Sequence, residues 1–211
     1  RIKVPAGGAT TWSIPSPNGE ESSTKMLEGI IVYTCRRRAY WPNQTPTGEP
    51  PACVSADCIT GIGTPGGNCD PVFESINGQR QQTHPGCPFN GWASAVKQDG
   101  TTGRGKACKE SRLVFLLRAG NMLPEVVIVP PGSLVSMKRY LFNLGLPFWA
   151  VQTKLTLART QNKDGIAYAQ IVPTKAGVLD EAAAKAVLAY AKELQAVFSA
   201  VTVDRTDVDG D

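Results

Sequence analysis

Several apolar stretches, of which one alternates with polar residues, predict β-strands, and turn residues or a helix separate them. The first, Glu28 to Trp41, is β-branched and aromatic and is long enough for a bent strand. Arg112 to Arg118 and Glu125 to Val129 follow, joined by an AGNMLP turn. Phe148 to Arg159 and Ile166 to Pro173 are the last two. Five strands in this pattern indicate a mainly β domain.

Two stretches have the period of a helix instead. Ser133 is in position to cap a helix over Leu134 to Leu144, which a Gly and a Pro then end. Asp180 to Ala200 is rich in alanine and has its apolar residues at helical spacing. Residues 1–27 are rich in Gly, Pro and Ser without any period, and we interpret them as a flexible N-terminal arm.

Strand, strand, strand, helix, strand, strand is the element order of the OB-fold, a five-stranded barrel whose face and loops commonly hold oligonucleotides. We therefore predict a mainly β protein with some α-helix, containing an OB-fold domain over residues 28–178. A C-terminal helix (179–200) and an acidic tail (201–211) would follow. Residues 42–111 become an insertion between the first and second strands, in one of the loops with which such barrels grip a ligand. Other small antiparallel barrels share this strand count.

The insertion holds five of the six cysteines and the only histidine, among many Gly and Pro residues and few aliphatic ones. A loop of this length needs ordering energy of its own, and Zn²⁺ bound by thiolates supplies it where a hydrophobic core is missing. Four of these cysteines stand next to a Gly, Pro or small residue that lets the backbone turn around an ion. The predicted structural zinc site is Cys53, Cys69, Cys87 and Cys108, with Cys58 and His84 as substitutes.

Disulfides are the alternative, and they would require an oxidising compartment. Residues 1–12 lack the apolar core of a secretory signal, which favours the metal. Cys35 lies in a strand pattern and is interpreted as a small buried side chain. Four thiolates would leave no open position for water, so the zinc would be structural rather than catalytic.

The net charge of +4 is unevenly placed along the chain. Arg36 to Arg38 form one basic block, and a second surrounds the last cysteine, whereas residues 201–211 carry four aspartates. A basic body with an acidic tail indicates a polyanionic partner and a segment that mimics or competes with it. No apolar run approaches the roughly 18 residues of a membrane span.

Single-stranded nucleic acid binding requires cations along the backbone and exposed rings on which bases stack. Both occur together in YTCRRRAYW, residues 33–41, where alternate residues share one face of a strand. The alternatives are that the aromatic residues are core and that the arginines protect a solvated edge strand. The predicted nucleic-acid-binding residues are Arg36, Arg37, Arg38, Tyr40, Trp41, Trp92, Arg104, Lys106, Lys109, Trp149, Lys154 and Tyr168.

The segments RAYWP, PPACVSADCITGIG, GGNC, GCPFNGWASA, GKACKESRLVFLLR, VPPGSLVSMKRYL and GLPFWAVQTKLTL resemble a family of bacteriophage single-stranded DNA-binding proteins, over residues 28–173. The stretch from Asp70 to Gly86 is longer than the corresponding spacing in that pattern. The resemblance implies sequence-nonspecific binding of single-stranded DNA in phage-type replication or recombination, inside the bacterial host cell. It implies the same four cysteines as zinc ligands and an acidic tail that recruits replication or recombination proteins.

Two other classes compete with this interpretation. An enzyme would need His or paired carboxylates in a pocket, and the single His lies in none of the HExxH, GxSxG, GxxxxGK[ST] or HxE-PCxxC patterns, so we predict no catalytic residue. Asp57 and Asp70 beside cysteines could indicate a metal-dependent nuclease, but they are more typical of turns. A protein-interaction module, bound to a host polymerase or a defence complex, is the stronger alternative, since arginine and aromatic residues are also enriched at protein interfaces.

Overall fold

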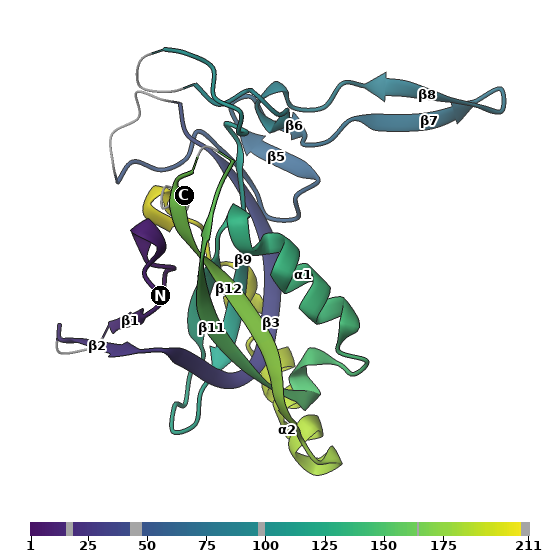
Figure 1. The fold of residues 1–211 in the computed structure, drawn as a ribbon. Helices are drawn as coiled ribbons and strands as arrows, with labels where there is room; N and C mark the ends of the chain where they lie inside the picture. The colour runs from purple at the N-terminus through teal and green to yellow at the C-terminus, as the bar shows by residue number, and fades with distance from the viewer. Residues whose placement is uncertain (16–18, 43–47, 97–99, 164, 208–211) are drawn as a thin grey trace. The chain divides into compact units, whose positions relative to one another are not determined.

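The computed structural model describes residues 1–15, 19–42, 48–96, 100–163 and 165–207, and Figure 1 shows its ribbon. The chain divides into two compact units. Unit 1 is formed mainly by Arg1–Cys35 and Ser111–Val201, and unit 2 by Arg36–Glu110 and Thr202–Asp209. The cysteine-rich insertion predicted from the sequence therefore corresponds closely to unit 2.

Unit 1 is built on five strands in the order β10, β9, β3, β11, β12. All five predicted strands are present, and the prediction of a mainly β protein with some helix is confirmed. Their bounds are β3 Met26–Tyr40, β9 Lys109–Leu117, β10 Glu125–Val129, β11 Val151–Gln161 and β12 Ala167–Val178. Each runs antiparallel to its neighbour in the pairs β9–β10, β3–β11 and β11–β12.

The prediction of a closed barrel is wrong, because the described strands β10 and β12 at the two ends of the row do not pair with each other. The outer edge of β10 is taken by Ile2, whose N–H donates to the carbonyl of Val126 at 2.8 Å and whose carbonyl accepts from the N–H of Ile128 at 2.9 Å. On β12, the N–H of Ile171 donates to Ser133 Oγ at 2.9 Å. Since both edges already have partners, the seam between them stays open.

The N-terminal segment, interpreted from the sequence as a flexible arm, packs into the core of unit 1. Trp12 is completely buried, and its Nε1 donates to the carbonyl of Leu155 at 3.3 Å. It begins β1 (Trp12–Pro15), which pairs with β2 (Glu21–Thr24), and the short helix η1 (Ala6–Gly8) packs on β12. Burial of one such large side chain is worth roughly 1.5–3 kcal/mol. The core that it joins contains Ile2, Leu27, Ile31, Val114, Leu116, Val127, Val129, Met137, Leu155 and Ile171.

Helix α1 (Leu134–Asn143) runs beside β12 and ends one residue before the predicted end (Figure 1). Its predicted cap, Ser133, makes no capping bond, because its hydroxyl accepts from β12 instead. The predicted C-terminal helix is divided at Leu194 into α2 (Glu181–Glu193) and α3 (Gln195–Ser199). Among the described residues, no helix combines the length and the hydropathy that a membrane crossing requires.

Unit 2 consists of short strands and turns. The end of β3 pairs with β4 (Cys53–Ser55), followed in the sheet by β5 (Thr60–Gly63) and β6 (Gly67–Asn68). A separate hairpin, β7 (Val72–Ile76) with β8 (Gln79–His84), extends away from β5 and β6 (Figure 1).

The acidic tail is packed where it is described. Val203 and Asp207 of unit 2 are both buried, and the backbone N–H of Asp204 donates to Asp207 Oδ2 at 2.9 Å. Asp209 and Asp211, the other two predicted tail carboxylates, lie outside the described residues.

Candidate nucleic-acid interface and cysteine cluster

Arg38 forms the polar centre of unit 2. Its side chain is only 6% exposed and holds three groups: Glu110 at 3.1 Å, Asp70 at 3.0 Å and the carbonyl of Cys58 at 3.0 Å. Burial by itself lowers the pKa of Arg38, but the hydrogen bonds and charges of Asp70 and Glu110 outweigh it and keep the pKa above its usual value. Arg38 is therefore a structural cation that organises the loop, and its predicted contact with nucleic acid is at odds with its burial.

The two neighbouring arginines are also engaged within the unit. Arg37 is buried, and its Nη1 donates to the carbonyls of Arg36 and Ala56. Arg36 is the most exposed of the three and forms an ion pair with Glu110, with Nη2 and Oε1 2.8 Å apart. All three arginines of the strand therefore bind backbone carbonyls or carboxylates within the unit. Of the three, Arg36 is the one whose side chain is accessible to solvent.

Tyr40 and Trp41, the rings predicted to stack bases, pack within unit 2. Tyr40 stacks on Phe89 with centroids 4.1 Å apart and an angle of 9° between the rings, a pairing worth about 0.5–1.5 kcal/mol beyond the area buried. Burial, and then the charge of Cys87, raise the pKa of Tyr40. Trp41 is 7% exposed and donates to the carbonyl of Glu49 at 3.1 Å. Both rings stabilise the unit, and Trp41 presents almost no surface to a ligand.

Trp92 is the predicted aromatic residue that does face solvent, with 79% of its surface exposed. The ammonium of Lys106 lies 5.4 Å from the centre of its ring, within cation–π range. Lys106 is held in this position by Asn90 Oδ1, at 3.1 Å. Arg104, also exposed, accepts at its backbone carbonyl from Ala93, next to Trp92, while Lys109 is half-buried at the start of β9. Trp92 and Lys106 thus form a pair of exposed ring and cation, and the backbone of Arg104 lies next to it.

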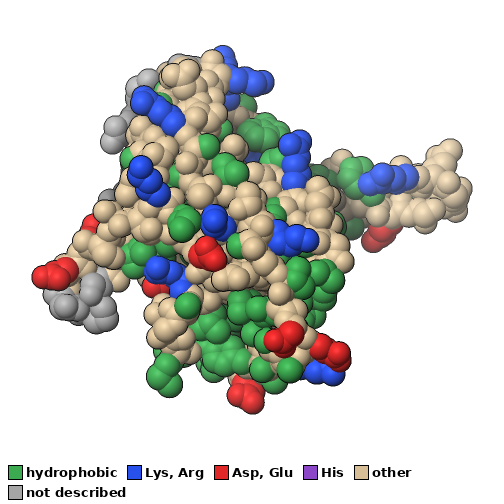
Figure 2. Space-filling view, turned by 60° about the horizontal axis from the view of Figure 1, so that its bottom comes forward, with side chains coloured by type: hydrophobic (Ala, Val, Ile, Leu, Met, Phe, Trp, Pro, Cys, Tyr) green, Lys and Arg blue, Asp and Glu red, His purple; other side chains and the backbone are tan. Residues whose placement is uncertain are grey.

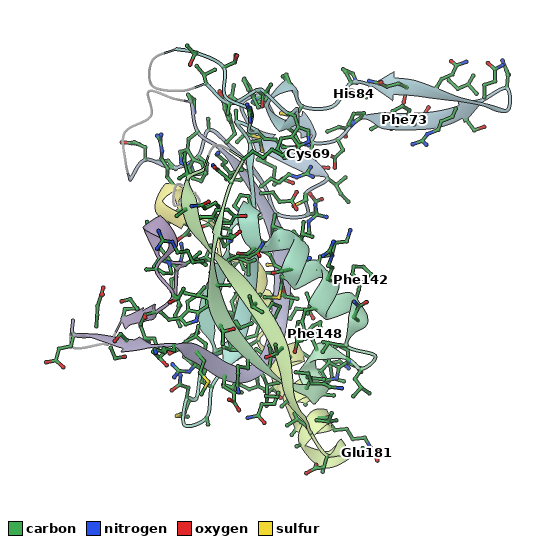
Figure 3. All side chains as sticks on the ribbon, viewed as in Figure 1. Cys69, Phe73, His84, Phe142, Phe148 and Glu181 are labelled. Atoms are coloured by element: carbon green, nitrogen blue, oxygen red, sulfur yellow. The ribbon has the colours of Figure 1, made fainter. Side chains whose placement is uncertain are left out.

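The β7–β8 hairpin carries a second such pair, which sequence reasoning missed. The guanidinium of Arg80 lies over the ring of Phe73, 4.5 Å from its centre, and Figure 3 shows Phe73 on this projecting hairpin. In the register of the hairpin, Phe73 lies opposite Gln82 and Ser75 lies opposite Arg80. The ring of Phe73 and the side chains of Arg80 and Gln82 therefore share one face. All side chains of β8 are exposed. The hairpin could have been predicted from the sequence, because Asn77–Gly78 between two strand-like runs is a strong hairpin signature.

The three remaining predicted residues belong to unit 1 and lie on different elements. Trp149 is half-buried in the short helix η4 (Phe148–Ala150), with its ring edge-on to Phe148 at 5.1 Å. Lys154 on β11 lies opposite Glu28 of β3. Tyr168 on β12 covers Gly132, where an added Cβ would come within 2.9 Å of the ring. The structure does not bring Tyr168, Lys154 and Trp149 together into one binding surface.

The outer face of the sheet in unit 1 is covered by α3. Phe115 on β9 points away from the core, since its neighbours Val114 and Leu116 point into it. Tyr33 on β3 packs edge-on against Phe115, with ring centroids 5.6 Å apart. Phe198 of α3 packs on both rings, 4.7 Å from Phe115 and 5.8 Å from Tyr33. A ligand on this face would have to displace α3.

The four cysteines of the predicted zinc site line one small cavity in unit 2, of about 10 Å³. They come from separate elements: β4, the turn after β6, the residue before η2 (Pro88–Asn90), and the residue before β9. Figure 3 labels Cys69 near the base of the β7–β8 hairpin. The cavity members are Cys53, Cys69, Cys87 and Cys108.

Backbone contacts hold these cysteines in place. The N–H of Cys87 donates to the carbonyl of Cys69 at 3.4 Å, and Asn90 Nδ2 donates to the same carbonyl at 2.9 Å. Gly61 packs so closely that a Cβ there would lie 2.9 Å from Cys53 Sγ. Burial, then the charges of Cys87 and Cys69, raise the pKa of the Cys108 thiol to about 12.

The substitutes Cys58 and His84 do not line this cavity. Cys58 is buried beside Arg38, and burial first, then Glu110, raise its pKa to about 11. His84 lies on the hairpin, where Nδ1 accepts from the N–H of Gly86 at 3.0 Å. Within the part of the chain that the structure describes, no three His, Cys, Asp or Glu side chains have the arrangement of a metal site. All six cysteines are free thiols. That four of the cysteines line one cavity is the observation that bears on a metal.

Figure 2 shows Lys, Arg, Asp and Glu side chains interspersed with hydrophobic ones on the face in view, so no field of a single sign dominates it. Any polyanion contact there would depend on local pairs of cation and ring.

Comparisons of the chain with protein-family models, with curated proteins and with solved structures gave no match.

Proposed function

We propose that the protein binds single-stranded DNA without marked sequence preference and carries out no chemical step. The observation that carries this proposal is the presence in unit 2 of two exposed rings, Trp92 and Phe73, each with a cation against it. Single-strand binders combine such rings with cations along the phosphate backbone. The resemblance to phage single-stranded DNA-binding proteins points to the same function, in replication or recombination.

The strand order of unit 1 supports the proposal. With β3 as the first strand, β9 and β10 are the second and third, and β11 and β12 the fourth and fifth. Strand 1 then lies between strands 2 and 4, as in an OB-fold, and α1 connects strands 3 and 4. We propose that unit 1 is an OB-type sheet whose closing pair, strands 3 and 5, has been replaced by the N-terminal segment. Unit 2 is then the elaborated loop between strands 1 and 2, a usual site of ligand contact.

In this proposal Lys106 and Arg80 neutralise phosphates, and Trp92 and Phe73 stack bases. Base stacking on an aromatic residue is worth about 1–3 kcal/mol per base and tolerates any sequence. Release of counterions from the phosphates makes the affinity fall as salt rises.

We also propose that Cys53, Cys69, Cys87 and Cys108 hold a structural zinc ion. Two observations support this: the four cysteines line one small cavity of about 10 Å³, and thiolates are preferred ligands of zinc. Bound zinc would supply ordering energy to a unit with few aliphatic side chains. It would thereby fix Asn90, and through Asn90 the ammonium of Lys106 against Trp92.

The test is fluorescence anisotropy with labelled oligo-dT and a matched duplex at two salt concentrations. The proposal expects preference for the single strand, weakened by salt, and a loss of about 1–3 kcal/mol in Trp92→Ala. Met122→Ala, which removes an exposed apolar side chain from unit 1, is the matched control and should bind as the native protein does. Equal affinity of Trp92→Ala and native protein would remove Trp92 from the site, and no binding of either DNA would overturn the function.

A protein-interaction module is the second candidate, because unit 2 also exposes aliphatic side chains. Ile62 on β5 is 72% exposed, and Ile59 beside it is exposed as well. Neither helps to bind a phosphate backbone, whereas both suit a partner's apolar surface. Failure to bind nucleic acid, together with a partner interaction lost in Ile62→Ser, would favour this candidate.

A further inference from the structure

A groove runs between α1 and β12 in unit 1, far in sequence from the proposed stacking residues of unit 2. Its volume is about 390 Å³, within the range of about 300–1,000 Å³ that is usual for small-ligand sites. Val172 and Pro173 of β12 and Leu144 at the end of α1 form an apolar part of the wall. The polar part is made by Arg139, Asn143 and Lys175.

These three polar side chains are not used by the fold. Among the residues that the structure describes, Arg139, Asn143 and Lys175 make no side-chain hydrogen bond and no ion pair. No carboxylate lines the groove. The hydroxyl groups in the wall are, by contrast, already engaged: Tyr140 with Thr153 Oγ1 at 2.7 Å, and Ser136 with the carbonyl of Ile171. The groove therefore presents two cations and one amide, with no internal counter-charge.

An exposed aromatic ring lies on the same helix. Phe142 is 78% exposed, and the ammonium of Lys138 lies 5.8 Å from its ring centre. Figure 3 labels this ring on α1. Phe142 and Asn143 follow Arg139 by three and four residues, so the ring lies beside the guanidinium on one side of the helix surface and the amide lies beside it on the other. Asn143 lines the groove itself, and Phe142 lies next to it. A cation with no carboxylate partner beside an open ring is the combination that a nucleotide requires.

We propose that the groove between α1 and β12 is a second binding site, which takes one nucleotide unit through its phosphate. Arg139 and Lys175 contact the phosphate oxygens, because a guanidinium and an ammonium with no carboxylate partner favour an anion and Arg can bind it with two parallel hydrogen bonds. Asn143 hydrogen-bonds the sugar or the base edge, and Phe142 offers the base a stacking face. The phosphate belongs either to a single strand of nucleic acid or to a free nucleotide. Only the first of these two sources rests on the proposed function.

The test uses the whole ¹⁵N-labelled protein, titrated with dTMP in one arm and with dT₄ in the other. The expected result is a shift of the Asn143 side-chain amide and of Arg139 Nε in at least one arm. The double variant Arg139→Gln/Lys175→Gln should weaken the binding at least tenfold. The control is Lys185→Gln/Lys192→Gln, which removes the same charge from exposed positions of α2 and should bind as the native protein does.

The two sources are separated by comparing the arms. Saturation with dT₄ but not dTMP identifies the polymer. In that case the salt slope for longer oligo-dT should fall by about 0.7 in the groove variant, since the groove takes one phosphate and each phosphate contributes about 0.7 for single strands. Saturation with dTMP alone identifies a free nucleotide.

The second site and the proposed function can be contradicted independently of each other. Unshifted Asn143 and Arg139 signals in both arms, or equal binding by the groove variant and its control, would overturn the second site. Oligo-dT affinity that still depends on Trp92 would then leave the proposed function in place. Conversely, dTMP binding at Asn143 with no affinity for any oligonucleotide would keep the second site and remove the function.

Discussion

Phe198 of α3 packs against Phe115 of β9 with ring centroids 4.7 Å apart and an angle of 37° between the ring planes. Tyr33 completes the cluster, 5.6 Å from Phe115. The C-terminal helical segment therefore closes the outer face of the sheet in unit 1 and is part of its fold.

Replacing Phe198 with Ala should lower the free energy of unfolding by about 3 kcal/mol, because it removes a buried ring and leaves a cavity over Phe115. Val197→Ala, next to it but exposed, should change the free energy by less than about 0.5 kcal/mol. Urea titration followed by circular dichroism measures both. Equal stability of the two variants would show that α3 does not pack on the sheet in solution.

Arg38→Ala should destabilise the protein by about 2 kcal/mol, because the substitution leaves Asp70 and the carbonyl of Cys58 without their charged donor. Arg36→Ala removes a pair that is more exposed and should cost less than about 1 kcal/mol. Denaturant unfolding of the two variants gives the comparison. A larger cost for Arg36→Ala would contradict the assignment of Arg38 as the central cation.

The native protein should contain about one equivalent of zinc per chain if the four cavity cysteines bind it. Cys87→Ser should lose the metal and the order of unit 2, whereas Cys58→Ser, which changes a buried cysteine outside the cavity, should keep the metal. Elemental analysis and protease digestion of both variants provide the measurement. Retention of zinc in Cys87→Ser would exclude this ligand set.

The carboxylate of Asp57 accepts hydrogen bonds that hold a turn in unit 2, so the stability of this turn should depend on pH. Hydrogen bonds from the N–H groups of Ile59 and Thr60, and from Ser55, lower the pKa of Asp57 to about 2. Because this folded-state pKa lies below the ordinary value of 3.8, the stabilisation is complete above about pH 4 and disappears as the pH falls towards 2.

Asp57→Asn should therefore be less stable than the native protein at pH 7, and the difference should shrink between pH 4 and pH 2. Urea midpoints at pH 7, 4 and 2 test this expectation. A constant difference at all three pH values would mean that the charge of Asp57 is not what stabilises the turn.

Strand positions in unit 1 could be predicted from the sequence because β-branched residues and turn residues alternate clearly there. The Glu125–Val129 strand has the predicted bounds, and the Leu134 helix ends one residue early. The open seam and the covered edge of β10 could not be predicted. They depend on Ile2, which comes from a segment without periodicity and pairs with a strand more than a hundred residues away.

The candidate interface was predicted from composition, which does not distinguish buried residues from exposed ones. RRRAYW has the composition of a nucleic-acid site, yet Arg38 and Trp41 are buried, because Asp70, Glu110 and the carbonyl of Glu49 supply their partners from distant parts of the loop. Sequence spacing does not reveal such partners. Trp92 is exposed, as a stacking ring requires, and the four cysteines predicted as ligands from their neighbouring small residues line one cavity; both roles stay predictions.

We expect the bridge between Ile2 and Val127 to limit self-association of the protein. The strand Glu125–Val129 reads EVVIV, a short run of high β-propensity with one charge, and an uncovered edge of this kind can pair with another chain. Ile2 occupies the backbone groups that a second copy would use. A chain that lacks its first few residues should therefore expose unpaired backbone groups at the edge of β10 and precipitate more readily, even where its remaining fold is intact.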